Sequence, residues 1–114
     1  MKDDLVFIDH MLECIRRIEE YTASGKDAFL ASTLIQDAVI RNLQVLAESS
    51  KRISERARER SSAVPWRHIA GFRNVAVHEY LYIDLGYVWE IVSIDIPELK
   101  AKLTILRDKL VGTA

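Results

Sequence analysis

The sequence predicts an all-α fold, an antiparallel helical bundle of about four to six helices. Apolar residues recur every three or four positions, which is the period of a buried helix face. The alternating pattern of β-strands is absent, and glycine is scarce, with four in the chain. The 114 residues, 49% of them hydrophobic and 29% charged, suit one soluble domain over residues 1–114.

The N-terminal half of the chain predicts two helices. The first carries an apolar stripe and ends near Gly25. Its stripe consists of Leu5, Ile8, Leu12, Ile15 and Ile18. Asp27 can cap the second helix, whose alanines should let a neighbouring helix approach closely. We therefore expect two long helices packed against each other.

The C-terminal half predicts further helices after a break at residues 61–64. Pro65 suits the first turn of a new helix, because its missing N–H would have no acceptor there. Asp84 can start another helix, and Asp95 with Glu98 matches a capping box before the last one. That last helix bears a seam of leucines, Leu99, Leu103, Leu106 and Leu110. The seam predicts core, with an oligomer contact as the alternative.

The strongest chemical signal is the segment 73–78, which brings three functional side chains within six residues. Arg73 supplies a permanent cation with forked donors for phosphate oxygens, Asn74 an amide, and His78 a group that can exchange a proton near neutral pH. Glu79 and Tyr80 follow at once. This combination is the one that a phosphodiester-cleaving site needs.

The surroundings of this motif extend the signal over the last half of the chain. They comprise Pro65-Trp66, Gly71-Phe72, Arg73 to His78 with Tyr80, Ile83-Asp84, Val88-Trp89 and Ile96-Pro97-Glu98-Leu99. Together these segments resemble the HEPN ribonuclease toxins of the HepT type, and the length of the chain fits that family. The resemblance implies a helical fold that dimerises through a helical face, so that two copies of the motif share one cleft, and an RNA substrate (tRNA or mRNA).

The resemblance also implies a toxin–antitoxin module of the type VII kind. Its antitoxin would be a minimal nucleotidyltransferase that attaches AMP to the tyrosine of the motif, here Tyr80. The added phosphate charge would compete with substrate for Arg73. The alternative for Tyr80 is a half-buried structural tyrosine.

The residues themselves give a chemical reason for a dimeric site. A single histidine cannot be base and acid in the same instant, whereas His78 from each of two copies can, which predicts metal-independent cleavage with no cofactor. Asn74 shares a helix face with His78 and can support it. Arg73 lies about 140° from His78 around a regular helix. Either the helix is irregular there, or Arg73 swings around, or it addresses the partner's half of the cleft.

Charge is unevenly distributed along the chain. Residues 41–78 hold eight Lys or Arg against three Glu, a net charge of +5, whereas the remainder holds eight against fourteen, −6. Clustered cations favour a local polyanion site. The candidate substrate-binding residues are Arg41, Lys51, Arg52, Arg67 and His68. The alternative for the run 51–60 is a solvated helix face with pairs of opposite charge.

Other functions and sites find less support. A non-catalytic, nucleotide-binding helical partner of a nucleotidyltransferase is the second candidate, and it would need Arg73 more than His78. A kinase or other transferase lacks its Gly-rich loop. His10 and Cys14 could offer two metal ligands, but no third is apparent, so no metal site is predicted. No stretch suits a membrane span or a signal peptide, and we expect a cytoplasmic protein without membrane contact.

Overall fold

The computed structural model describes residues 2–75 and 84–112, and these residues form helices without a strand. Three long helices make the body of the fold, α1 (Lys2–Tyr21), α3 (Thr33–Lys51) and α7 (Ile96–Gly112). Shorter segments join them, namely α2 (Lys26–Ala31), α4 (Glu55–Glu59), α5 (Trp66–Ala70), the 3₁₀-helix η1 (Gly71–Asn74), α6 (Leu85–Glu90) and the π-helix η2 (Ile91–Asp95). The predicted all-α fold is confirmed.

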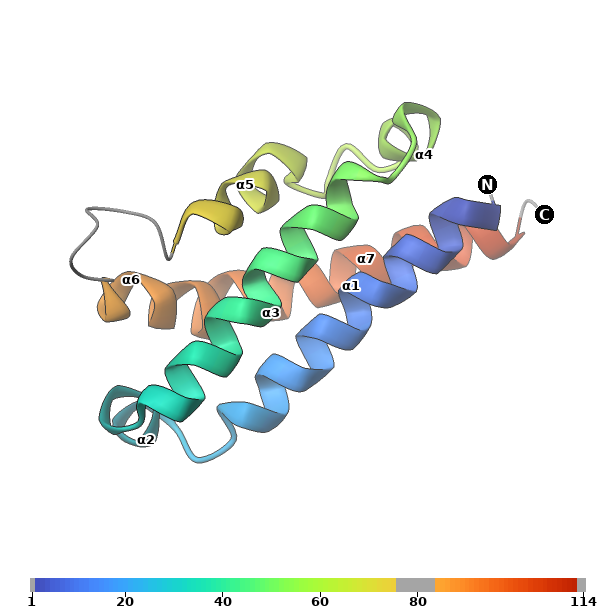
Figure 1. The fold of residues 1–114 in the computed structure, drawn as a ribbon. Helices are drawn as coiled ribbons and strands as arrows, with labels where there is room; N and C mark the ends of the chain where they lie inside the picture. The colour runs from blue at the N-terminus through green and yellow to red at the C-terminus, as the bar shows by residue number, and fades with distance from the viewer. Residues whose placement is uncertain (1, 76–83, 113–114) are drawn as a thin grey trace.

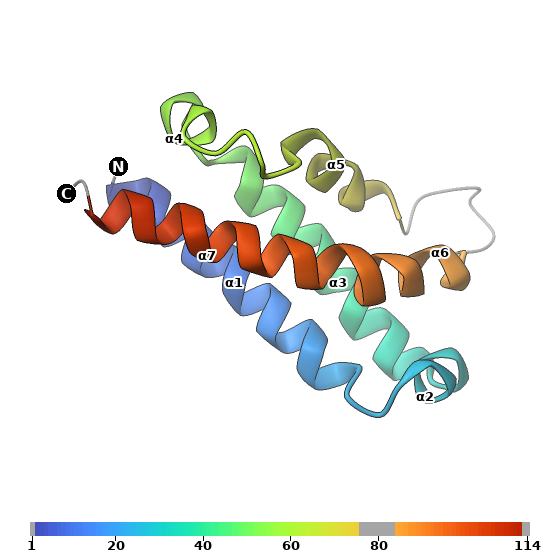
Figure 2. The ribbon, with the colours of Figure 1, turned by 180° about the vertical axis from the view of Figure 1, so that it is seen from behind.

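The long helices pack as two layers. Figure 1 shows α1 and α3 side by side and antiparallel, and Figure 2 shows α7 crossing them on the opposite side. Helices α5 and η1 lie on α3, and with α4 they form the upper edge of the molecule in Figure 1. The start of α1, the end of α7 and α4 lie at the same end (Figures 1 and 2). None of the described helices is both long and apolar enough to cross a bilayer.

The predicted apolar seams form the core. In α1, Ile8, Ile15 and Ile18 are completely buried, and Phe29 from α2 joins them. The seam of α7 is buried at Leu99, Leu103, Leu106 and Leu110. Full burial of such a side chain contributes about 1.5–3 kcal/mol. The interpretation of this seam as core is therefore confirmed.

The prediction of one second helix capped by Asp27 is wrong. The chain enters α2 at Gly25, whose φ of 95° lies in the left-handed region that glycine adopts without a Cβ penalty. The helix then breaks at Ser32, where the backbone is extended and the hydroxyl accepts a hydrogen bond of 3.2 Å from the Ile35 N–H. Ser32 is a better cap than Asp27, because it satisfies a backbone donor at the start of α3.

The predicted capping box at Asp95 is also wrong, although Asp84 caps α6 as expected and accepts a hydrogen bond of 3.0 Å from the Tyr87 N–H. Helices α6, η2 and α7 run on as one rod, which crosses the middle of Figure 1 behind α1 and α3. A proline ring clashes with the carbonyl four residues earlier in a regular α-helix. The residue four positions before Pro97, Ser93, lies in the wider turn of η2, which accounts for a helix that continues past a proline.

The basic run 51–60 does not form a single helix face. Helix α3 ends at Lys51, and Ser54 caps α4. Arg58 turns back and donates to the carbonyls of Ser50 at 2.7 Å and Ile53 at 3.3 Å. The Ser50 carbonyl lies in the last turn of α3, where the regular donor four residues on is missing, and the Ile53 carbonyl lies just beyond the helix. The charge of Arg58 therefore serves the fold.

A buried carboxylate ties the start of α1 to α4. Asp4 is only 3% exposed. It accepts hydrogen bonds from the Ser54 N–H at 2.7 Å and the Ser54 hydroxyl at 2.8 Å. The same hydroxyl accepts one of 3.1 Å from the Ala57 N–H. Asp4 thus holds the cap of a helix that lies 50 residues away in the sequence.

We predict that Asp4→Ala lowers the free energy of unfolding by about 1–3 kcal/mol, because it leaves the Ser54 N–H without its buried acceptor. Urea denaturation followed by circular dichroism measures this loss. The matched control is Asp3→Ala at the exposed neighbouring position, which should change stability by less than about 0.5 kcal/mol. Equal losses in the two variants would show that the Asp4 contacts do not stabilise the fold.

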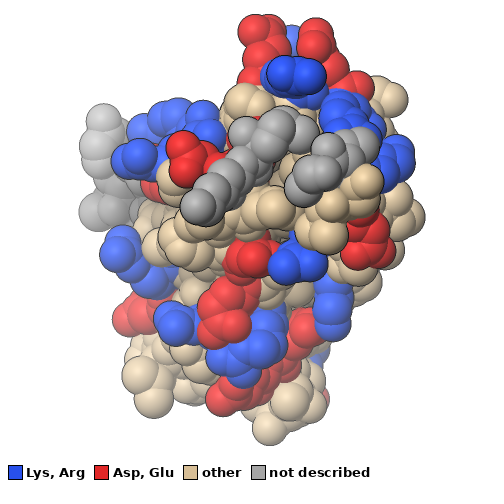
Figure 3. Space-filling view, turned by 90° about the vertical axis from the view of Figure 1, so that its right-hand side faces the viewer, with Lys and Arg blue, Asp and Glu red and all other residues tan. Residues whose placement is uncertain are grey.

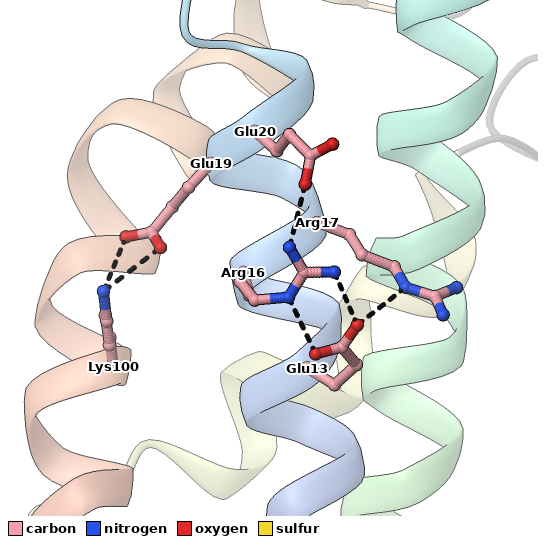
Figure 4. A network of polar contacts seen from close by, with 6 residues as sticks. All are labelled: Glu13, Arg16, Arg17, Glu19, Glu20 and Lys100. Carbon is pink, nitrogen blue, oxygen red and sulfur yellow. Dashed lines mark hydrogen bonds and ion pairs between the residues drawn. The ribbon is translucent and has the colours of Figure 1, made fainter.

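A second polar network covers the outer face of α1 (Figure 4). Glu13 accepts hydrogen bonds from Arg16 at 2.8 and 2.9 Å and from Arg17 at 3.1 Å, and Arg16 also binds Glu20. The hydrogen bonds from Arg16 and then Arg17 lower the pKa of Glu13 from its usual 4.5 to about 2. The stabilisation from this carboxylate is therefore present above pH 4.5 and is lost as the pH falls towards 2.

We predict that a carboxyl-resolved NMR titration of the folded protein gives a midpoint of about 2 for Glu13. Arg16→Gln should raise this midpoint towards the usual value, and Arg17 should keep it from reaching that value, since its hydrogen bond remains. Arg56→Gln, on the exposed side of α4, is the control and should leave the midpoint in place. A midpoint near 4.5 in the unmodified protein would contradict the network.

Candidate functional site

The 3₁₀-helix η1 presents Arg73 and Asn74 on the surface. A 3₁₀-helix has three residues per turn, so residues three apart share a side. Phe72 and Val75 are such a pair, and both are buried, whereas Arg73 and Asn74 between them are exposed. Because η1 packs against α3, the two apolar anchors fix the direction in which Arg73 leaves the fold.

Arg73 has only one loose partner among the described residues. Its Nε lies 3.8 Å from Oε1 of Glu48 on α3, and the two side chains are 48% and 58% exposed. An exposed pair at this separation contributes little to stability, because water competes for both charges. Among the residues that the structure describes, none therefore holds the guanidinium tightly against an incoming anion.

Glu48 also borders a hollow of about 410 Å³ between α1 and α3. Arg41 and Arg52 line the same hollow, and the guanidinium of Arg52 lies 5.7 Å from the ring of Phe7. Two of the predicted substrate-binding arginines thus line a hollow whose Glu48 is also the partner of Arg73. Lys51 is exposed at the end of α3 and does not line this hollow.

Arg67, His68 and Asn74 gather on another surface, between α5, η1 and α6. One hollow of about 390 Å³ is bordered by Asn74 and Asp84, and a neighbouring one of about 720 Å³ by Arg67 and His68. Further described residues on their walls are Pro65, Trp66, Gly71, Val75 and Tyr87. Gly71 and Tyr87 belong to both hollows, which therefore form one groove, called the α5–α6 groove below.

His68 is held in place by two contacts in this groove. Its Nε2 lies 2.9 Å from Oδ2 of Asp95, the last residue of η2. Its ring meets the ring of Phe72 edge to face, with centroids 5.3 Å apart. Sequence reasoning missed the partner, because Asp95 lies 27 residues away and its pattern suggested a helix cap. No local signal links the two residues.

Basic and acidic side chains alternate over the face of the molecule seen in Figure 3, where the ends of α1 and α7 lie. The basic residues of the segment 41–78 are divided between separate surfaces, because Arg41 and Arg52 line one hollow and Arg67 lines another. His10 lines the hollow between α1 and α3, and burial raises the pKa of the neighbouring Cys14 thiol. Within the described ranges, no three His, Cys, Asp or Glu side chains form a candidate metal site.

Comparison with known proteins decides the family. The family model described as Ribonuclease HepT-like matches residues 11–106. The chain belongs to the HepT-like ribonuclease family. This confirms the resemblance that the sequence motifs indicated. The matched range includes Arg73 and the residues of the α5–α6 groove.

Named relatives agree with this assignment. The chain is 37% identical to a gamma-glutamylcyclotransferase and putative RNase of Methanocaldococcus jannaschii over 96% of its own length, but spans only 50% of that relative. It is 33% identical to a putative RNase of the same organism, covering 92% of this chain and 97% of the relative. It is 35% identical to a probable ribonuclease HepT of Thermococcus cleftensis, covering 89% and 93%. No solved structure matches the chain.

In this HepT-like chain, two of the predicted site residues lie outside the described residues. These are His78 and Tyr80. The placement of His78 near Arg73, the dimeric cleft and the modification of Tyr80 therefore stay predictions. The backbone at Arg73 is 3₁₀ rather than α-helical. The chain near His78 lies outside the described residues, so the three alternatives for bringing Arg73 and His78 together stay predictions.

Proposed function

We propose that this HepT-like protein is a metal-independent endoribonuclease, the toxin of a type VII-like toxin–antitoxin module in the cytoplasm. It acts as a homodimer whose composite site contains Arg73 and His78. The observation that carries the proposal is Arg73 itself, which η1 holds out of the fold with a single loose partner among the described residues. Family membership and relatives named as ribonucleases support RNA as the substrate.

Arg73 binds and stabilises the reacting phosphate. Its forked guanidinium can donate two parallel hydrogen bonds to phosphate oxygens and stays charged at every relevant pH. A phosphate group replaces Glu48, because the loose contact of 3.8 Å costs little to break. The fixed cation then lies where the phosphorane develops its negative charge, which is where it lowers the barrier.

His78 moves the protons. The imidazole of one copy takes the proton of the 2′-hydroxyl, the 2′-oxygen attacks phosphorus, and the bond from phosphorus to the 5′-oxygen breaks. The imidazolium of the other copy protonates the leaving 5′-oxygen. The products are a 2′,3′-cyclic phosphate and a 5′-hydroxyl, and no metal is needed. Asn74, exposed beside Arg73, orients the imidazole or holds the substrate.

Arginines in the hollow between α1 and α3 extend the site. Arg41 and Arg52 in the hollow between α1 and α3 hold flanking phosphates, and Lys51 adds charge nearby. The second candidate function uses the same surface, since a cationic hollow can bind a nucleotide without cleaving it. In that case the chain is a non-catalytic partner of a nucleotidyltransferase. The two functions differ in their need for His78.

We predict that His78→Ala lowers the cleavage rate of a fluorescent oligoribonucleotide by about 10²–10⁴-fold, because proton transfer is lost. Arg73→Ala should lower it by about 10²–10³-fold through loss of the cation. The matched control is Arg56→Ala, an exposed arginine on α4 outside both surfaces, which should keep the full rate. All rates are measured in excess chelator.

Full activity of His78→Ala in a preparation free of other nucleases would reject His78 as a catalytic residue. Activity that disappears with chelator would reject the metal-independent mechanism. Binding of nucleotide without cleavage of any RNA, with dependence on Arg73 alone, would favour the non-catalytic partner.

The module supplies a separate prediction. A nucleotidyltransferase encoded beside this gene should attach AMP to Tyr80, which places phosphate charge two residues from His78 and competes with RNA for Arg73. Mass spectrometry of the co-expressed protein should find an adenylated peptide and a loss of cleavage activity. Tyr80→Phe is the control and should stay unmodified and active. Adenylate on another tyrosine, or only unmodified peptide, would contradict this assignment.

A further inference from the structure

The α5–α6 groove contains His68, whose ring is held in one orientation by neighbouring side chains. An ionised carboxylate accepts hydrogen bonds only, so the contact of 2.9 Å between Asp95 and His68 requires the proton on Nε2 of His68. In the neutral imidazole, Nδ1 is then an acceptor. The edge-to-face contact with the ring of Phe72 also holds the imidazole in place. His68 is 47% exposed, so this acceptor is within reach of a ligand in the groove.

The pair of His68 and Asp95 contributes little to the stability of the fold. Both side chains are partly exposed, Asp95 at 32%, and such pairs contribute between zero and about 1 kcal/mol. Asp95 moreover belongs to the π-helix η2, a rare conformation that is frequent at functional sites. The neighbouring groups add the chemistry of a binding site. Arg67 supplies a cation, and Tyr87, which is 46% exposed, supplies an aromatic face.

We propose that the α5–α6 groove is a nucleotide subsite, in which His68, positioned by Asp95, accepts a hydrogen bond from the nucleotide. Arg67 binds the phosphate of that nucleotide, and Tyr87 stacks on its base. The donor is either a 2′-hydroxyl or an amino group of the base. This subsite rests on the proposed ribonuclease function. In that function, His68, Arg67 and Tyr87 determine which nucleotide binds beside the cleavage site. Asn74 and Asp84 line the other end of the groove, and Asn74 is the neighbour of Arg73 in η1.

The test measures binding separately from cleavage. Fluorescence anisotropy on ice follows the binding of an oligoribonucleotide and of the DNA of the same sequence, and a gel confirms that each probe is intact. His68→Ala should weaken RNA binding by about three- to tenfold, the effect of one hydrogen bond. A loss on RNA but not on DNA identifies the 2′-hydroxyl as donor, and equal losses identify a base amino group. Both results support the subsite.

Further variants separate recognition from folding. Asp95→Ala should weaken binding, and the double variant His68→Ala/Asp95→Ala should bind no worse than His68→Ala, because Asp95 acts through His68. Tyr87→Leu should weaken binding by at least about fivefold, and Tyr87→Phe should restore it, since the ring is kept. Arg67→Gln should reduce the slope of log affinity against log salt by about 0.7. Asp37→Ala, exposed on α3, should bind as the unmodified protein does.

RNA and DNA affinities of His68→Ala within twofold of the unmodified protein would overturn the subsite. So would a fall in kcat with unchanged KM and affinity, which would assign His68 to the chemical step. Failure of the proposed ribonuclease is recognised differently, by full cleavage with His78→Ala or by the absence of cleavage in the unmodified protein. Binding that depends on His68 would then still support the subsite.

Discussion

The burial of Phe72 against the rest of the core is the contact on which the candidate site depends. Phe72 is among the largest completely buried side chains, and it lies in η1, which packs on α3. The same ring fixes the edge of His68 on one side, and the residue that follows it in the chain is Arg73. The position of Phe72 therefore determines the positions of both Arg73, the proposed phosphate-binding cation, and His68, the proposed recognition residue. A side chain of the core decides the geometry of the surface.

Patterns that depend on burial were predicted well from the sequence, because the helical period of apolar residues reports directly on the core. The leucines of α7 and the isoleucines of α1 are buried as expected. The cap at Asp84 was also found, since it depends only on a residue three positions away. The membership of the HepT-like family followed from motifs that lie close together in the chain.

The cap predicted at Asp27 failed because Ser32 caps the long helix instead. Other interpretations failed because a polar side chain had a choice between a partner near it in the sequence and one in another element. Asp95 was expected to cap α7, but the continuous helix leaves no end to cap, and the carboxylate binds His68 instead. Arg58 was counted as surface charge, yet it satisfies carbonyls at the end of α3. Asp4, for which the spacing in the sequence suggested no partner, accepts hydrogen bonds from Ser54. Such partners meet only after folding, so spacing in the sequence does not show them.

The π-helix η2 sets the rotational register between two helices that share one axis. Each residue of a helix turns the chain by about 100°, so removing one residue from η2 would rotate α6 by that angle relative to α7. Tyr87 and Asp84 would then turn away from their present places in the groove, and Val88 of α6, which is completely buried, would turn out of the core. The wall of the groove and the packing of α6 are thus set by the same turn of helix. A length change of a single residue in η2 would therefore alter the proposed subsite and the core beneath it together.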